Sequence, residues 1–241
     1  MPAIRLLPEL LINQIAAGEV IERPASALKE LLENSLDAGA TDIAVQLEAG
    51  GIKLLRIRDN GRGIAADELK FALMRHATSK ISSLDDLQSV ASMGFRGEAL
   101  ASMAAVAQLT LTSRTSDAVH AHQITAIDGQ LGDIAPASHP IGTTVEIREL
   151  YFNTPARRKF LKTEATEYAY CEEAFKRIAL SRPDVAFSLQ HNGRTIWQLA
   201  AEANPLRRVT TLLGTEFGDA AVEVSRHAAG LSMTGFAAQP A

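Results

Sequence analysis

Residues 92–106 read SMGFRGEALASMAAV, two glycines three residues apart that lead directly into a run of helix formers. Gly94 and Gly97 enclose Phe95 and Arg96, and Glu98, Ala99 and Leu100 then open a run of helix formers. Glycines let a backbone approach a bound group closely, and the N-terminus of a helix offers unpaired N–H groups and a partial positive charge. The stretch therefore predicts a loop that folds around an anionic ligand.

The composition is that of a soluble globular protein. The chain has 241 residues, 46% of them hydrophobic, and a net charge of -4, which is enough to bury one full core and to begin a second. No run approaches the roughly 18 to 20 apolar residues that span a bilayer, and Pro8, Glu9 and Asn13 interrupt the N-terminus. We therefore expect a cytoplasmic protein with no membrane partner.

The single cysteine, Cys171, excludes an internal disulfide and a multi-cysteine zinc site. We expect it to be a small structural residue within a helix. No histidine lies at a sequence spacing from another candidate ligand that would indicate a metal site. We interpret the histidines as structural or surface residues. An acidic net charge does not favour nucleic acid as the dominant partner. Because the net charge is summed over the whole chain, it does not exclude local basic patches.

The segment 24–38, PASALKELLENSLDA, predicts an amphipathic helix. Leucines at helical spacing form one apolar stripe, Pro24 suits the first turn and Gly39 suits the stop. Glu30 and Asn34 are four residues apart, so they stand one turn apart on the polar face of this helix. Taken alone, these two residues favour a solvated helix surface over a functional site.

Two strands and a turn follow the helix. Apolar residues alternate over 42–48, DIAVQLE, a turn falls at Gly50 and Gly51, and a second strand is predicted over 53–59, KLLRIRD. The period of two places Asp59 on the same inward face as Leu55 and Ile57. A buried carboxylate needs a partner. A plain surface turn at Asp59–Gly61 is the simpler alternative.

Further along, the patterns predict an alternation of helices and hairpins. We expect a helix over 66–77 and then a polar loop region over 76–94 with a short helix at 82–90. Strands follow at 108–114 and 143–150, with hairpins and turns between them. The remaining predicted elements are a helix over 163–180, a hairpin of 185–190 with 195–200, a helix at 207–214 and a strand at 221–225. The chain after Pro205 is shorter than the about 40 residues that a small fold needs by itself. We therefore predict one domain over 1–205 and part of a second over 206–241.

Three elements together suggest a nucleotide site. Asp59 could accept a hydrogen bond from an exocyclic amino group of a base, and Gly61 and Gly63 would let the backbone approach it. Asn34 offers the neutral oxygen that suits Mg²⁺, which usually keeps several waters and phosphate ligands. Glu30, one turn away, could take a proton from an attacking water.

The loop over 94–100 would close around the triphosphate of that nucleotide. No G-x-x-x-x-G-K-[ST] sequence occurs, which excludes a P-loop, and no full G-x-G-x-x-G fingerprint is present. A different phosphate-binding architecture is required.

Six stretches of the chain stand out together: ELLENSLDAGA at 30–40, DNGRG at 59–63, HATSK at 76–80, GFRGEALAS at 94–102, GTT at 142–144 and YFNTPARRKFL at 151–161. In combination they closely resemble the N-terminal region of the MutL family of DNA mismatch-repair proteins. DNGRG alone indicates only the wider GHKL superfamily of gyrases, heat-shock chaperones and histidine kinases. The stretches GFRGEALAS and YFNTPARRKFL are typical of a much narrower group of proteins. The resemblance implies an α+β fold, a two-layer α/β sandwich of the Bergerat type, followed by the start of a domain like the second domain of ribosomal protein S5.

The resemblance also implies roles for residues at matching positions. Glu30 occupies the position of the family's general base for ATP hydrolysis, and Asn34 that of its Mg²⁺ ligand. Asp59 matches the adenine-binding carboxylate, with Gly61 and Gly63 in the same loop. Further nucleotide contacts fall at Thr78, Ser79, Lys80 and Thr143, and the phosphate-binding lid at Gly94, Phe95, Arg96, Gly97, Glu98, Ala99 and Leu100.

The activity implied by the resemblance is slow hydrolysis of Mg-ATP, with dimerisation on ATP binding. The cycle would couple the mismatch-recognition protein MutS to a downstream nuclease or helicase on DNA, in the bacterial cytoplasm and at the nucleoid during repair. A family lysine of the second domain reaches the γ-phosphate, and its counterpart would lie beyond Ala241, so we expect weak turnover. A gyrase-like ATPase subunit is disfavoured by the narrower motifs.

A basic cluster formed by Arg157, Arg158, Lys159 and Lys162 raises a DNA-binding hypothesis. Contacts to phosphates predict an affinity that falls steeply with salt. A solvated loop, or an internal contact of the guanidinium groups, is the alternative. The rival to an ATP-driven switch is therefore an ATP-binding protein and DNA interaction module without significant turnover.

Overall fold

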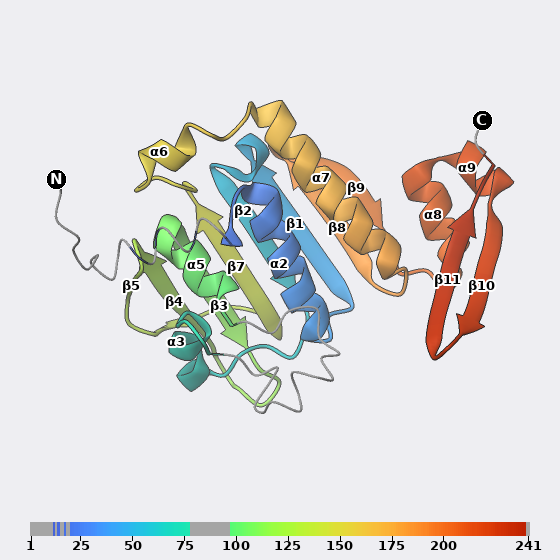
Figure 1. Ribbon diagram of the computed structural model, residues 1–241. Helices are drawn as coiled ribbons and strands as arrows, with labels where there is room; N and C mark the ends of the chain where they lie inside the picture. Colours follow the sequence, from blue (N-terminus) through green and yellow to red (C-terminus); the bar gives the residue numbers. More distant parts are fainter. Residues whose placement is uncertain (1–11, 13, 15–16, 18–19, 78–96, 240–241) are drawn as a thin grey trace.

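The computed structural model describes residues 12, 14, 17, 20–77 and 97–239. Figure 1 shows one large sheet with helices across one face and a smaller unit of helices and a hairpin beside it. The strands of the large sheet are β1 (Asp42–Glu48), β2 (Leu54–Asp59), β3 (Gln108–Arg114), β4 (Ala121–Ile127), β5 (Gln130–Leu131), β6 (Ala135–Ala137), β7 (Gly142–Arg148), β8 (Ala186–His191) and β9 (Arg194–Leu199).

The helices divide between the sheet and the smaller unit. Those associated with the sheet are α2 (Pro24–Asp37), α3 (Leu69–Ala72), α5 (Ala99–Val106), α6 (Pro155–Arg158) and α7 (Glu164–Ser181), with 3-10 turns η1 (Ala49–Gly51) and η2 (Ala66–Glu68). The smaller unit contains α8 (Pro205–Leu213), α9 (Thr215–Ala220) and the hairpin of β10 (Val222–Ala228) and β11 (Leu231–Ala237).

The sheet is mixed, with the strand order β5-β4-β3-β7-β2-β1-β8-β9 and with β6 paired to β4. In the described part of the chain, neighbouring strands are antiparallel except β1 and β8, which run parallel. Helices α2, α5 and α7 cross the same face of the sheet in Figure 1. This arrangement confirms the predicted α+β fold, a two-layer α/β sandwich.

The core lies between α2 and the strands beneath it. The leucine stripe of α2 is buried, and so are the inward residues of β1 and β2, as their alternation predicts: Leu28, Leu31, Leu32, Leu36, Ile43, Val45, Leu47, Leu55 and Ile57. Helix α7 packs beside α2. No helix of the described residues is long and apolar enough to cross a membrane.

Cys171 of α7 is fully buried, and its Sγ lies 3.6 Å from the carbonyl oxygen of Gly50. Burial raises the pKa of the Cys171 thiol to about 12, which keeps the sulfur protonated and unreactive at neutral pH. The prediction of a small structural residue within a helix is confirmed.

The helix predicted over 66–77 is much shorter than expected. Only η2 and α3 form, and α3 ends at Ala72. Leu69 and Leu73 are buried, whereas Phe71 is 60% and Met74 48% exposed, so no continuous stripe exists to hold further turns against the core. The short helix expected at 82–90 lies outside the described residues.

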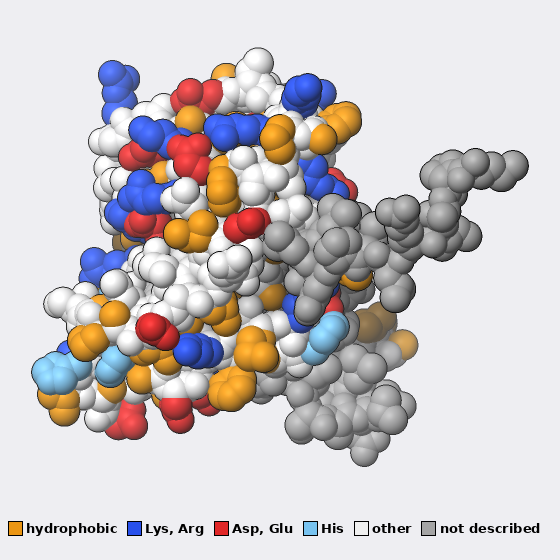
Figure 2. Space-filling view, turned by 90° about the vertical axis from the view of Figure 1, so that its left-hand side faces the viewer, with side chains coloured by type: hydrophobic (Ala, Val, Ile, Leu, Met, Phe, Trp, Pro, Cys, Tyr) orange, Lys and Arg blue, Asp and Glu red, His pale blue; other side chains and the backbone are white. Residues whose placement is uncertain are grey.

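Helices α6 and α9 and strand β11 were not predicted as such. Helix α6 begins with Pro155 at its first turn and lies within the stretch NTPARRKFL. Figure 2 views the molecule from the left-hand side of Figure 1, where α6 lies; Lys and Arg side chains occupy the upper part of this face, with hydrophobic and acidic side chains among them. Near the C-terminus, α8 overlaps the helix predicted at 207–214, and β10 overlaps the strand predicted at 221–225.

Candidate functional site

Asp59 lies at the end of β2, on the sheet face that α2 covers, and is only 7% exposed. Its Oδ1 accepts hydrogen bonds from the backbone N–H of Gly61 at 2.9 Å and of Thr143 at 3.2 Å. Its Oδ2 accepts from the hydroxyl of Ser35 at 3.0 Å. The inward orientation predicted from the period of two is therefore confirmed, and the partners are three neutral donors.

Burial raises the pKa of Asp59 above its ordinary value of 3.8, while the hydrogen bonds from Gly61, Ser35 and Thr143 oppose the rise. Because the folded protein holds this proton more tightly than the unfolded chain, the group contributes stability below the unfolded pKa that is lost as pH rises through the folded pKa. A carboxylate has about four acceptor positions and three are used here. One acceptor position of a desolvated carboxylate remains for a donor from a ligand.

Thr143 and Ser113 form the floor beside Asp59. In the sheet, Thr143 of β7 pairs with Asp59 on one side and with Ser113 of β3 on the other. The hydroxyl of Ser113 lies 2.9 Å from that of Thr143, accepts from the N–H of Ile64 at 2.8 Å and lies 3.0 Å from the carbonyl oxygen of Gly142. Ser113 thus ties the loop after β2 to the start of β7.

Glycine is required at two points of this floor for close contact of backbones. Gly63 has a φ of 76°, and a Cβ there would lie 2.2 Å from the carbonyl oxygen of Arg114. Gly142 has a φ of 124°, and a Cβ would lie 2.1 Å from the carbonyl oxygen of Asp59. Any side chain at either position would push the loop away from the strand and displace Asp59.

Helix α2 positions Glu30 and Asn34 on the same element as Ser35, which holds Asp59. Both side chains are half-buried, and Lys29 Nζ lies 3.9 Å from Glu30 Oε1. The carboxylate of Glu30 and the amide oxygen of Asn34 are the hard oxygen donors that Mg²⁺ accepts. Within the described ranges, no group of three or more His, Cys, Asp or Glu residues is placed to hold a metal.

The start of α5 supplies the described part of the predicted lid. Gly97 has a φ of 61° and packs so closely on Ala77 that a Cβ would lie 2.4 Å from its carbonyl oxygen. Glu98 precedes the helix, and its Oε1 lies 3.2 Å from Nδ1 of His76. Ala99 and Leu100 form the first turn and are half-buried, and α5 contacts α2. The predicted contacts Thr78, Ser79, Lys80, Gly94, Phe95 and Arg96 lie outside the described residues.

Known proteins with the same architecture carry an ATPase fold. Residues 21–136 match the family model described as histidine kinase-, DNA gyrase B- and HSP90-like ATPase. Over its whole length the chain is 54% identical to the DNA mismatch repair protein MutL of Neisseria meningitidis, of which it covers 36%. It is 59% identical to MutL of Ralstonia nicotianae over 98% of this chain and 37% of that protein.

Solved structures agree with these relatives. The Aquifex aeolicus MutL ATPase domain complexed with ADP superposes with a TM-score of 0.67 at 32% identity, covering 86% of this chain and 73% of that one. The chain belongs to the MutL family. A second structure of the Aquifex aeolicus MutL ATPase domain superposes with a TM-score of 0.69 at 29% identity, covering 92% of this chain and 74% of that one.

Membership of the MutL family confirms the fold expected from the six sequence stretches, a GHKL ATPase domain. It also identifies DNA mismatch repair as the process in which the family acts. The chain spans a little over a third of the length of the curated MutL relatives, at 36% and 37%.

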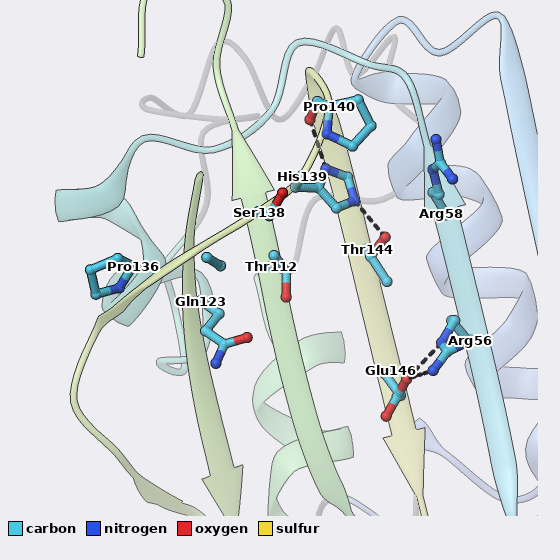
Figure 3. Close-up of a pocket in the computed structure, with 11 residues that line it drawn as sticks. Arg56, Arg58, Thr112, Gln123, Pro136, Ser138, His139, Pro140, Thr144 and Glu146 are labelled. Atoms are coloured by element: carbon cyan, nitrogen blue, oxygen red, sulfur yellow. Dashed lines mark hydrogen bonds and ion pairs between the residues drawn. The ribbon is translucent and has the colours of Figure 1, made fainter. Parts of the chain in front are cut away.

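A separate hollow of about 500 Å³ lies on the uncovered face of the sheet (Figure 3). In Figure 3, Arg56 reaches Glu146, and His139 lies between Pro140 and Thr144, with Nε2 2.7 Å from the Thr144 hydroxyl. Thr144 follows Thr143, so its side chain projects from the opposite face. None of the residues predicted to bind nucleotide lines this hollow, which is therefore distinct from the site expected of a MutL protein.

Sequence reasoning missed Ser35 and Ser113, although a signal for each was present. Ser35 stands four residues after Leu31, which places it on the buried stripe of α2. Ser113 continues the alternation of Leu109 and Leu111 and is buried with them. A hydroxyl in the apolar register of a helix or strand needs a polar partner, and here each one supports the loop that holds Asp59.

Proposed function

We propose that this chain binds Mg-ATP at the site formed by α2, the end of β2, the start of β7 and the start of α5, and that it hydrolyses ATP slowly. The observation that carries the proposal is Asp59, a buried carboxylate with neutral partners and one acceptor position left. The MutL ATPase domain of Aquifex aeolicus forms a complex with ADP, which supports an adenine nucleotide as the ligand here.

We assign the site residues the following roles, which for the described residues agree with their positions. Asp59 accepts a hydrogen bond from the adenine amino group, with Gly61, Gly63 and Thr143 shaping the floor. Glu30 takes a proton from the attacking water, and the α5 N-terminus binds phosphate through its N–H groups. Asn34 would hold Mg²⁺, which when bound neutralises charge on the phosphates. We also assign nucleotide contacts to Thr78, Ser79 and Lys80, and lid function to 94–100.

We infer that the nucleotide acts as a switch within a longer protein. Binding of ATP closes the lid over 94–100 and favours dimerisation, and hydrolysis releases both. The dimer would couple mismatch recognition by MutS to a downstream nuclease or helicase on DNA, in the bacterial cytoplasm. The membership of the MutL family supports this cycle.

The substitution Asp59→Asn is expected to weaken the binding of a non-hydrolysable ATP analogue with Mg²⁺ by about 10- to 100-fold. The amide has the shape of the carboxylate but replaces one acceptor oxygen by an N–H donor that faces other donors, and a hydrogen bond to a charged group contributes about 1.5–3 kcal/mol. Isothermal titration calorimetry measures the change, with the exposed Asp67→Asn as the matched control, which should bind as the parent chain does.

A thermal unfolding scan accompanies this titration, because Asp59 also holds the loop after β2. Ser35→Ala removes one supporting hydrogen bond and leaves the acceptor intact, so it should weaken binding less than Asp59→Asn. Parental affinity in a folded Asp59→Asn variant would show that this carboxylate does not contact the adenine.

We further propose that Lys159 and Lys162 contact the DNA backbone. Both are exposed, and neither has an ion-pair partner among the described residues. The other two cations of the cluster have internal contacts: Arg158 lies 3.4 Å from Glu149, and Arg157 is hydrogen-bonded to Tyr151, whose pKa it lowers against the larger opposing effect of burial.

This DNA contact predicts a measurable salt dependence. Each phosphate contact contributes a slope of about -0.9 for duplex DNA or about -0.7 for single strands in a plot of log affinity against log salt concentration. Replacing both Lys159 and Lys162 by alanine should make the slope less negative, by up to two such increments, between about 50 and 200 mM salt. An unchanged slope, measured by fluorescence anisotropy, would place the DNA elsewhere.

A further inference from the structure

Phe160 is 81% exposed, the largest exposed fraction of any large hydrophobic side chain among the described residues. It lies just after α6, between Lys159 and Leu161. An exposed aromatic ring does not stabilise the folded chain by itself, because its apolar surface stays in water.

The backbone around Phe160 is fixed by contacts on both sides. Its own N–H donates to the carbonyl oxygen of Arg157 at 2.9 Å, and the side chain of Leu161 packs against the core. The N–H of Lys162 donates at 2.8 Å to Oε1 of Glu167, a carboxylate that is only 1% exposed. Phe160 cannot turn inward unless Leu161 and Lys162 give up these positions, so the ring is held in solvent.

Cationic residues are neighbours of Phe160 in the sequence. Lys159 and Lys162 are exposed and flank Phe160 in the chain, and Arg158 precedes them. In Figure 2 the upper part of the face carries basic side chains with hydrophobic ones beside them. Exposed aromatic rings between cations are the features by which proteins bind single-stranded nucleic acid, since phosphates pair with the cations and an unpaired base stacks on the ring. Bases in a duplex are already stacked and offer no free face.

We propose that Phe160 is a stacking platform for one base of single-stranded DNA, whose adjacent phosphates lie on Lys159 and Lys162. The inference rests on the DNA contact proposed above and adds to it a preference for single strands. The lysines supply affinity for either form of DNA, whereas Phe160 acts only on a strand whose bases are free.

The test uses the full chain with a thymidine oligonucleotide and a duplex of equal length as probes. Phe160→Ala should weaken binding of the single strand about 5- to 100-fold, the magnitude of one stacked base, and leave duplex binding unchanged. Phe160→Trp should keep single-strand affinity. Trp197 is the only tryptophan of the chain, so in a Trp197→Phe background the fluorescence of the introduced indole should be quenched by the single strand and not by the duplex. Thermal unfolding confirms that each variant is folded.

The outcomes separate this inference from the DNA contact beneath it. Salt-dependent DNA binding by the parent chain, with no indole quenching and no single-strand loss in Phe160→Ala, would overturn the stacking role and leave the lysine contacts standing. Equal losses for both DNA forms would also overturn it. Absence of DNA binding by the parent chain would remove the DNA contact and the stacking role together. A change in self-association alone would assign the ring to a second copy of the chain and overturn the proposal.

Discussion

Replacement of Glu30 by glutamine is expected to slow ATP hydrolysis by about 10²- to 10⁴-fold, the usual contribution of a general base, while ATP affinity stays within about threefold. Glutamine keeps the length and shape of the side chain on α2 but cannot accept the proton of the attacking water. Phosphate release at saturating ATP measures the rate, and calorimetry of the same preparation measures the affinity.

A matched control is available on another helix. Glu173 of α7 is an exposed glutamate whose Oε1 lies 2.8 Å from Nε of Arg177, as Glu30 lies near Lys29, and Glu173→Gln should hydrolyse ATP at the parental rate. Parental turnover in Glu30→Gln would assign the base to another residue. A loss of affinity equal to the loss of rate would make Glu30 a binding residue instead.

The same assay decides between the two functional classes that the sequence leaves open. Turnover that is absent from the parent chain, with nucleotide affinity retained, would favour the ATP-binding and DNA interaction module. Turnover that depends on Glu30 favours the ATP-driven switch. The distinction is chemical, because only the switch needs a base placed next to the water, whereas both need the acceptor that Asp59 provides.

The inward position of Asp59 could be predicted because it depends on a local pattern, the alternation of Leu55 and Ile57. Its partners could not all be predicted, because one lies on α2 and another, Thr143, is 84 residues away. Thr143 reaches Asp59 only because β7 inserts between β3 and β2. Strand order is a property of the whole fold, and the period of a single strand carries no information about it.

The errors have the same origin. Helical spacing continues through 66–77, yet α3 ends at Ala72, because Phe71 and Met74 stay exposed and the segment has no continuous buried stripe. The hairpin of β8 and β9 was predicted from its own turn, but the parallel pairing of β8 with β1 brings together segments more than a hundred residues apart. In each case tertiary contacts decided between local possibilities.

Arg208 is the largest fully buried side chain, at 1% exposure, among the described residues. Its guanidinium donates to backbone carbonyl oxygens, most closely to those of Ala179 at 2.8 Å, Val185 at 2.8 Å and Ala200 at 2.7 Å. These carbonyls lie near the end of α7, before β8 and after β9, so one side chain of α8 joins three segments. Desolvation lowers the pKa of Arg208; the helix C-terminus nearby favours its charge.

Arg208→Met is expected to lower the free energy of unfolding by about 3–5 kcal/mol, because several buried carbonyl groups lose a charged donor at once and each unpaired group costs about 1–3 kcal/mol. Urea unfolding followed by circular dichroism measures the change. Arg207→Met is the matched control: its neighbour Arg207 is exposed and lies 3.9 Å from Glu202, so its loss should stay within about 0.5 kcal/mol. Equal effects of the two substitutions would contradict the role assigned to Arg208.

Arg208→Lys separates the charge from the shape of the guanidinium. Lysine keeps the charge but has one nitrogen, which cannot reach carbonyls on three segments as a planar fork does, so it should recover only part of the lost stability. The proposed boundary between domains, at 205 and 206, falls in the first turn of α8 (Pro205–Leu213), and Arg208 therefore links α8 to the sheet across it. If that boundary is correct, Arg208→Met should loosen α8 from the sheet as well as destabilise it, and amide hydrogen exchange should rise first in the residues after 205. Uniform protection across 206–239 in a destabilised variant would show that these residues unfold together with the sheet and would argue against a separate domain.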